Sequence, residues 1–199
     1  MVRLVDHLGE GLPARRLPMS HEEQSILKPV QLITAKPVLY VCNVDEEGLS
    51  GNDHTEVVAT RARSEGAGIV IICAEIEAEI ALLEAEDQAT FLADLGLPEP
   101  GLAKLAREAY RLLGLETFFT AGPKEIRAWT IHSGIKAPQA AGVIHTDFER
   151  GFIRAEVYRI DDLEKYGSEA AMRAAGKIRV EGKDYVVQDG DVVLYRFNV

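Results

Sequence analysis

The chain has 199 residues, of which 47% are hydrophobic and 27% are charged, a balance that is ordinary for a globular protein. It contains no apolar run of about 20 residues, which a membrane-spanning helix requires, and its start lacks the apolar core of a signal peptide. We therefore expect a cytoplasmic protein with no membrane partner. Two cysteines, and no histidine or cysteine at metal-ligand spacing, predict neither a disulfide framework nor a metal site.

The charge is divided unevenly along the sequence. Residues 1–114 hold 10 Lys and Arg against 19 Asp and Glu, whereas residues 115–199 hold 12 against 13. Binding to the phosphates of nucleic acid requires clustered cations. The acidic first part therefore argues against a nucleic-acid groove there, and the nearly neutral second part leaves the question open.

The chain opens with apolar residues at helical spacing in residues 2–8, a segment too short to form a helix by itself. We expect it to be the end of a longer helical element. A second helix is predicted to begin at a capping box, in which the Ser20 side chain accepts from the amide of Glu23 and the Glu23 side chain accepts from the amide of Ser20. Apolar residues carry this predicted helix toward Thr34.

Two continuous apolar runs, residues 37–42 and 68–73, are rich in β-branched residues and predict strands of a parallel sheet that is covered on both faces. Residues 53–65 between them read as a helix, which completes a βαβ unit. Further helices are expected at residues 75–83, 87–95 and 102–113. A single βαβ unit is an incomplete sheet, so we expect either further strands or a partner chain beside it.

The pattern changes after Leu115, where short strand-like segments alternate with short helical ones and turn residues. These features predict a compact α+β module over residues 115–199, a usual size for an independent domain. The strands are expected at residues 117–121, 125–132, 152–160, 185–187 and 192–197, and the helices at 137–143 and 168–175.

The first predicted strand ends in Asn43-Val44-Asp45-Glu46, and the second ends in Cys73-Ala74-Glu75. Ligands bind at the carboxyl ends of strands in open α/β sheets, so both positions are suitable for a binding site. Taken alone, the first tetrapeptide also fits an ordinary junction between a strand and a loop.

Longer stretches of the sequence resemble the YchF family of Obg-like ATPases. In P-loop GTPases of this kind, the base-reading NKxD motif stands where this chain has residues 43–46, and a Ser-Ala-Lys-like loop stands where it has residues 73–75. The resemblance extends from about residue 12 to residue 199. It rests on residues 32–46, 91–97, 115–122, 125–130, 137–156, 181–185, 189–192 and 196–199.

The resemblance implies an α/β fold followed by an α+β fold. Residues 1–114 would be the C-terminal part of a P-loop NTPase-type nucleotide-binding domain, with the remainder of a helical insertion, and residues 115–199 a TGS domain of β-grasp fold. It also implies ATP or GTP, with Mg²⁺, as cofactors of the full-length family, and the ribosome or RNA as partner. The nucleotide-binding residues that it implies are Asn43, Val44, Glu46, Cys73, Ala74 and Glu75, with the backbone near Val44 and the Asn43 amide meeting the exocyclic amine of adenine.

The chain departs from the family in its phosphate-binding part. No G-x-x-x-x-G-K-[ST] sequence is present, because the Gly-Lys pairs at 176–177 and 182–183 are followed by Ile178 and Asp184. Without that loop no ring of amides holds the phosphates and no hydroxyl binds Mg²⁺. We therefore expect a C-terminal portion that is inactive alone, and we assign no catalytic residue. The alternative is a non-enzymatic module whose TGS domain binds RNA or a protein.

A few polar and aromatic residues of the second part stand outside this resemblance. Trp129 is expected in the core rather than as a base-stacking platform. For His145 and Asp147, a loop capped by Asp147 and an RNA contact remain equally open. A modest basic patch is predicted, offset by nearby glutamates. Its cations are Arg127, Lys136, Arg150 and Arg154.

Overall fold

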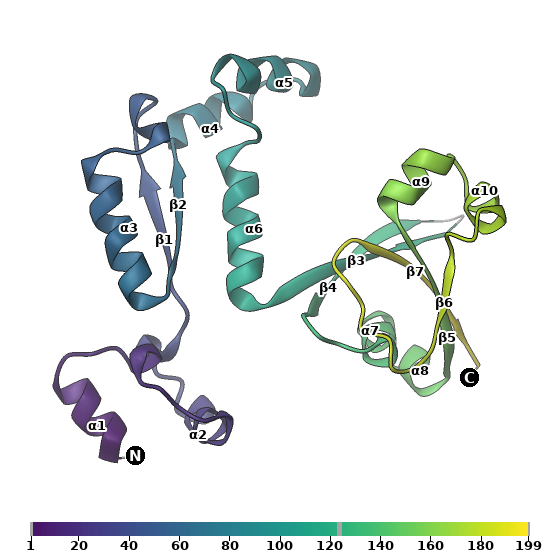
Figure 1. The fold of residues 1–199 in the computed structure, drawn as a ribbon, viewed down its shortest axis with the longest axis horizontal. Coiled ribbons are helices and arrows are strands. Elements are labelled where there is room, and N and C mark those ends of the chain that lie inside the picture. Colours follow the sequence, from purple (N-terminus) through teal and green to yellow (C-terminus); the bar gives the residue numbers. More distant parts are fainter. Residues whose placement is uncertain (1, 123–124, 199) are drawn as a thin grey trace. The chain divides into compact units, whose positions relative to one another are not determined.

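The computed structural model describes residues 2–122 and 125–198, and these form two compact units, Met1–Leu113 and Gly114–Val199 (Figure 1). The chain passes from the first unit to the second between Leu113 and Gly114. Each unit has its own sheet and its own clusters of buried apolar residues.

The first unit is built on the predicted βαβ element, which is confirmed. Strands β1 (Leu39–Asn43) and β2 (Gly68–Ile72) pair in parallel, with Asn43 opposite Ile72, and helix α3 (Asp53–Glu65) connects them. Helix α3 begins at a capping box, in which the Asn52 side chain accepts from the amide of Thr55 at 3.0 Å and the Asn52 amide donates to the Thr55 hydroxyl at 2.8 Å. The helix ends at Gly66, whose left-handed backbone (φ 64°) suits a residue without a side chain.

Strand β1 is less buried than the sequence predicts. Val70 of β2 is fully buried, because α3 and α6 (Gly101–Leu113) both lie against β2. Val41 of β1 keeps 45% of its surface exposed. The expectation that both strands are covered on both faces is therefore wrong for β1 within the described residues.

The segment before the sheet contains helices α1 (Val2–Gly9) and α2 (His21–Leu27) and the short 3₁₀ turns η1 (Ala14–Arg16), η2 (Lys28–Val30) and η3 (Ile33–Ala35). The predicted capping box is present, because both hydrogen bonds between Ser20 and Glu23 are formed. The prediction that α2 continues toward Thr34 is wrong. Pro29 has no amide hydrogen to continue the hydrogen bonds of the helix, and Gln31 is left-handed with φ 53°.

Three helices follow β2. Helices α4 (Ala74–Ile80) and α5 (Ala85–Asp94) pack together through an apolar cluster. The short 3₁₀ turn η4 (Glu47–Ser50) also contributes a residue to this cluster. Helix α6 then leads to the second unit, and α4 to α6 correspond to the three helices predicted there. The cluster consists of Cys73, Ile76 and Ile80, with Leu49, Phe91, Leu92 and Leu95 packed against it.

Among the described residues, the second unit holds a five-stranded sheet in the order β4-β3-β7-β5-β6. Its first strand β3 and its last strand β7 lie side by side and run parallel, and the other pairs are antiparallel. The first and last strands of the unit are therefore neighbours at the centre of the sheet. The strand bounds are Leu115–Ala121 for β3, Ile126–His132 for β4, Phe152–Arg159 for β5, Arg179–Glu181 for β6 and Asp191–Phe197 for β7.

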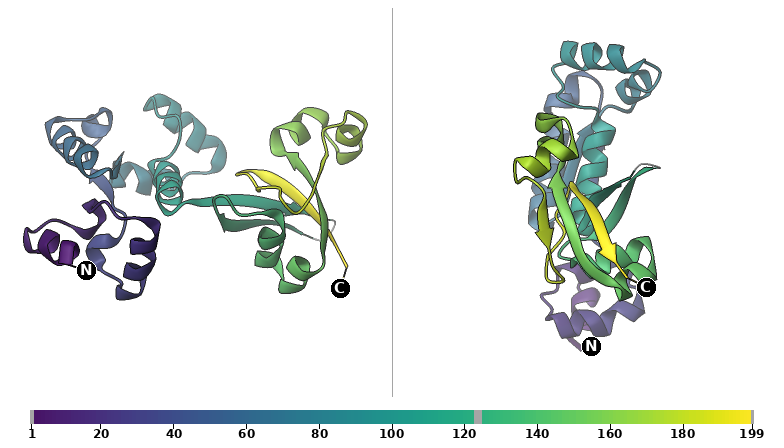
Figure 2. Two further views of the ribbon diagram at one scale, coloured as in Figure 1. Left: turned by 60° about the horizontal axis from the view of Figure 1, so that its bottom comes forward. Right: turned by 90° about the vertical axis from the view of Figure 1, so that its right-hand side faces the viewer.

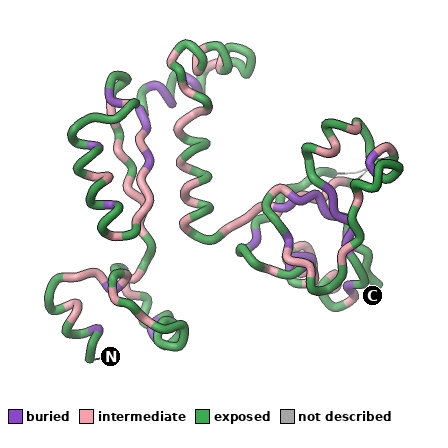
Figure 3. The backbone as a smooth tube through the Cα atoms, viewed as in Figure 1, coloured by how far each residue is buried: buried purple, intermediate pink, exposed green. Residues whose placement is uncertain are grey.

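Helices cover both faces of this sheet, as the views in Figure 2 show. Helices α7 (Ala137–Ile144) and α8 (Thr146–Arg150) contribute to the main core, which includes Phe118, Val157 and Val193. Helices α9 (Ile160–Tyr166) and α10 (Glu169–Ala174) form a smaller cluster around the fully buried Met172. The buried stretches of this unit follow its strands in Figure 3.

One prediction for the second unit is wrong. Residues 185–187 do not form a strand, because Val186 makes only an isolated bridge to Lys136. The strand that pairs with β5 at the edge of the sheet is β6. Of the two alternatives left open for His145 and Asp147, the loop capped by Asp147 is not formed, because the Nδ1 atom of His145 accepts from the Asp147 amide at 3.2 Å. Helices α8 and α9 were not predicted, since a five-residue and a seven-residue helix show little periodicity.

The carboxylate of Glu65 connects three parts of the first unit. It accepts hydrogen bonds from Arg15 at 2.9 Å, from Arg61 at 2.5 Å and from the Tyr40 hydroxyl at 3.0 Å, and its side chain is completely shielded from solvent. Hydrogen bonds from Arg15, followed by those from Arg61, lower the pKa of Glu65 to about 2. The N-terminal segment, β1 and the end of α3 are therefore held by one charge.

We expect Glu65→Gln to lower the melting temperature of the protein at neutral pH. The pKa of Glu65 is lower in the folded state, so its stabilising effect is present above pH 4.5 and is lost as the pH falls toward 2. Thermal melts of the variant and the wild type should therefore converge as the pH is lowered. Glu22→Gln, at an exposed position of α2, is the control, and an equal difference at all pH values would contradict the assignment.

Candidate functional site

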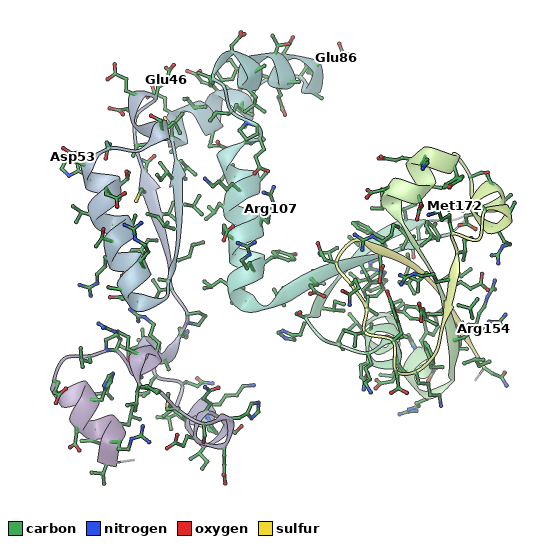
Figure 4. The ribbon with its side chains drawn as sticks, viewed as in Figure 1. Glu46, Asp53, Glu86, Arg107, Arg154 and Met172 are labelled. Carbon is green, nitrogen blue, oxygen red and sulfur yellow. The ribbon has the colours of Figure 1, made fainter. Side chains whose placement is uncertain are left out.

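The candidate site lies at the carboxyl edge of the parallel sheet, where β1 and β2 both end. The loop after β1 runs through residues 44–46 into η4, and α4 begins at Ala74, close behind β2. Figure 4 labels Glu46 at this end of the sheet. Parallel pairing brings the two predicted segments, residues 43–46 and 73–75, to the same edge.

Two hydrogen bonds join the chain at the ends of β1 and β2. The Oδ1 atom of Asn43 accepts from the backbone amide of Ala74 at 3.0 Å, and the amide of Val44 donates to the carbonyl of Ile72 at 2.9 Å. The first bond supplies a partner for an amide at the start of α4, which no bond within that helix could satisfy. It also leaves the two N–H groups of the Asn43 side chain and the carbonyl of Val44 as the groups to test against a ligand.

The loop after β1 is held in a fixed turn by residues that the site prediction did not include. Asp45 Oδ1 accepts from the amide of Gly48 at 2.9 Å. A Cβ atom on Gly48 would lie 2.9 Å from the Val44 Cβ and 3.1 Å from Asn52 Nδ2, so only glycine fits. The sequence signal was the Asp-x-x-Gly spacing, which is typical of a side-chain-capped turn.

The predicted site residues differ in exposure. Asn43, Glu46, Ala74 and Glu75 are exposed, and Val44 is half-buried. Cys73 is 3% exposed and packs against Ile76 and Ile80. The Cys73 thiol therefore belongs to the apolar cluster, and only the backbone of this residue can face a ligand.

Two hollows lie away from this edge. One, of about 970 Å³ in the first unit, is bordered by residues from Arg15 to Val38 and by Glu65 to Ala67, with Leu112. The other, of about 420 Å³ in the second unit, is lined by Trp129, Phe148 and Phe197, among others. Trp129 is half-buried against the main core, its Nε1 donates to Thr120 at 2.9 Å, and the Arg127 guanidinium lies 4.1 Å from its ring.

The described residues hold no group of three or more His, Cys, Asp or Glu side chains that could bind a metal ion. Within residues 2–122 and 125–198, no helix has the length and apolar character needed to cross a membrane.

Comparison with known proteins identifies relatives along the whole chain. The family model YchF-GTPase_C, "Protein of unknown function (DUF933)", matches residues 115–198. The Ribosome-binding ATPase YchF of Bacillus subtilis is 50% identical over 190 residues, covering 94% of this chain and 52% of that protein. The Obg-like ATPase 1 of Rattus norvegicus is 40% identical over 181 residues, covering 89% of this chain and 46% of that protein.

A solved structure matches as well. The Schizosaccharomyces pombe YchF GTPase superposes with a TM-score of 0.84 at 34% identity, covering 98% of this chain and 53% of that chain. The chain is a relative of the YchF and Obg-like ATPases and corresponds to the C-terminal part of their sequence. It spans about half the length of the curated relatives it matches. The resemblance inferred from the sequence is thereby confirmed.

Glu77 fixes α6 next to the carboxyl end of β2. Glu77 is 8% exposed, and its carboxylate accepts from the amides of Gly101 at 2.6 Å and Leu102 at 3.0 Å, which are the first two residues of α6. A Cβ atom on Gly101 would lie 2.8 Å from Glu77 Oε1 and 2.9 Å from a methyl carbon of Ile72. A negative charge at a helix N-terminus is favourable, and two otherwise unpaired amides are satisfied.

We expect Glu77→Ala to reduce the free energy of unfolding by about 1–3 kcal/mol, the cost of leaving two part-buried amides unpaired. Denaturant unfolding monitored by circular dichroism measures this loss. The matched control is Glu79→Ala, at an exposed position of the same helix. Similar losses for the two variants would show that Glu77 has no special role.

Proposed function

We propose that the first unit provides the base-binding edge of an ATP- or GTP-binding site of the P-loop NTPase type. The observation that supports this is the hydrogen bond from the Ala74 amide to Asn43 Oδ1, which holds both candidate loops at one edge of the sheet. A base-binding site requires such preorganised polar groups, because ordering them on binding would reduce affinity.

The groups at this edge favour adenine over guanine. A carbonyl such as that of Val44 accepts a hydrogen bond from the exocyclic amine of adenine. In the NKxD motif an Asp accepts two hydrogen bonds from guanine, whereas this chain carries the longer Glu46 at that position, and the neighbouring Asp45 carboxylate accepts from the amide of Gly48. Glu46 is exposed and directly precedes η4 as its N-cap residue. In this proposal Asn43, Val44, Glu46, Ala74 and Glu75 border the base, and Cys73 contributes through its backbone.

The residues present fit a base but not the phosphates or Mg²⁺. The sequence has no G-x-x-x-x-G-K-[ST] loop, which supplies the amides, lysine and hydroxyl that hold phosphate and metal. We therefore propose base binding for this chain and assign hydrolysis of ATP or GTP only to the longer relatives. By itself the chain should bind no nucleotide tightly and show no ATPase activity.

Titration of the isotope-labelled chain with adenosine and with guanosine tests base binding by NMR. We expect weak binding, with a Kd on the order of a millimolar or more, because only the base is contacted. The amide signals of residues 43–46 and 74–75 should shift, and adenosine should bind at least as well as guanosine.

Asn43→Ala removes the group that holds the two loops together and should abolish these shifts. Asn198→Ala, at an exposed asparagine of the second unit, should leave them unchanged. Shifts confined to the second unit, or a clear preference for guanosine, would refute the proposed site.

For the second unit we propose a TGS-type β-grasp domain that binds the ribosome or RNA in the cytoplasm. The parallel pairing of its first and last strands, with α7 packed on one face of the mixed sheet, supports the β-grasp assignment. Relatives named "Ribosome-binding ATPase" support the partner. A module that binds RNA or a protein without any nucleotide remains the alternative, which the adenosine titration separates from the first proposal.

We also propose that the two units are separate domains with a boundary near residue 114. Residues 115–199 expressed alone should unfold cooperatively, since their main core closes within the unit. Residues 1–114 alone should melt broadly or aggregate, because Val41 and β1 present an exposed apolar strand. Circular dichroism melts of both pieces measure this, and a sharp melt of soluble residues 1–114 would contradict the second expectation.

A further inference from the structure

Three arginines of the second unit surround one buried glutamate. The carboxylate of Glu156 on β5 lies 2.8 Å from Arg173 of α10, 3.3 Å from Arg196 of β7 and 3.9 Å from Arg154 of β5. We call these four residues the Glu156 cluster. The hydrogen bond from Arg173, followed by the one from Arg196, keeps the pKa of Glu156 below its ordinary value, so the glutamate is ionised at neutral pH.

The arrangement of the cluster is not one that sheet stability favours. Arg154 and Arg196 stand directly opposite each other in the register of β5 and β7. Like charges in this position destabilise a pair of strands. Glu156 can balance only one of the three guanidinium groups. A rule of local stability that is broken without full compensation is typical of a functional surface.

The three arginines remain accessible to a partner. Their side chains are 54%, 57% and 50% exposed for Arg154, Arg173 and Arg196, whereas the Glu156 side chain is 7% exposed. Figure 4 labels Arg154 on its strand. Helices α9 and α10 cover the part of this face around Tyr158 and Val192. The part that carries Arg154 and Arg196 is left open, and Arg173 reaches Glu156 from α10.

The charge balance of the cluster is positive. The buried carboxylate of Glu156 lies beneath the three guanidinium groups, and a second carboxylate, Glu169 on α10, acts on Arg173 and accepts from the Tyr158 hydroxyl at 3.3 Å. One positive charge is therefore in excess, and the cations are nearer to solvent than Glu156. Exposed Leu194 of β7 and Val180 of β6 are the apolar neighbours in the strand register.

We propose that the Glu156 cluster binds the phosphodiester backbone of RNA. The planar guanidinium group donates two parallel hydrogen bonds to a phosphate, and the shared contact with Glu156 orders the arginines before binding. This inference rests on the proposed ribosome or RNA partner and assigns it a surface. It predicts recognition of the backbone without base specificity, since none of the three arginines is held at a pocket that could read a base.

Fluorescence anisotropy with a labelled RNA hairpin, measured over a range of salt concentrations, tests this surface. Arg154→Gln should weaken binding by roughly three- to tenfold and lower the slope of log K against log salt by about one, the value for one lost phosphate contact. Arg154 is the variant of choice because it is the most distant of the three from Glu156. Arg150→Gln, at an exposed position of α8 that belongs to the opposite face, makes the same charge change and should have no such effect.

Glu156→Gln separates electrostatic binding from a loss of structure. Removing the buried negative charge should strengthen RNA binding, whereas partial unfolding would weaken it. Thermal melts show whether each variant is folded. If Glu156→Gln does not fold, Arg154→Gln still decides the test. Arg154→Gln that binds RNA like Arg150→Gln would overturn the assignment of the surface.

Co-sedimentation of the chain with ribosomes distinguishes failure of this inference from failure of the proposed partner. A wild-type chain that binds neither the hairpin nor ribosomes would refute the ribosome or RNA partner itself. Wild-type binding that is unchanged in Arg154→Gln would refute only the Glu156 cluster. Loss of ribosome binding in Arg154→Gln with unchanged hairpin binding would indicate an acidic protein partner and would overturn the RNA assignment.

Discussion

The parallel pairing of β1 with β2 is the constraint on which the candidate site depends. Two parallel strands end at the same edge of a sheet, so strand pairing alone brings the loops that follow them close together. The bonds from Val44 to Ile72 and from Ala74 to Asn43 then continue the pairing beyond the strands. The geometry of the base-binding edge is therefore a direct extension of the sheet, and changes that weaken this pairing would disturb it.

Within each unit, buried carboxylates hold helices, strands and loops together. Glu65, Glu77, Glu156 and Asp191 each accept from at least two donors. Asp191 is completely buried and accepts from the Tyr185 hydroxyl at 2.6 Å and the Gln188 amide at 2.9 Å. Burying a charge is costly unless it is paired, so these acids fix specific partners in place.

The second unit uses its two sheet faces differently. The face under α7 and α8 is apolar and closes over the main core. The opposite face is covered by α9 and α10 only around Tyr158 and Val192. Farther along the same two strands, this face carries Arg154 and Arg196. A single sheet can therefore supply stability through one face and an exposed charged surface through the other.

Local sequence determined the elements whose signals lie within a few residues of each other. Apolar β-branched runs predicted β1 and β2, and the Ser20–Glu23 capping box predicted the start of α2, because strand propensity and helix capping depend on neighbouring residues. The short strand β6 could not be predicted in this way, since three residues carry too little pattern. The family resemblance, which rests on long matching stretches, was also readable from sequence alone.

Tertiary structure decided the contacts between residues far apart in the chain. Asn43 and Ala74 are 31 residues apart, and Glu156 lies 40 residues from Arg196. Spacing along the chain does not encode such pairs, because they form only when strands align in register. For the same reason the sequence placed Cys73 at the site, whereas packing of α4 and α5 buried its thiol. The sequence thus predicted which edge of the sheet carries the site, and the tertiary structure determined which groups are exposed at that edge.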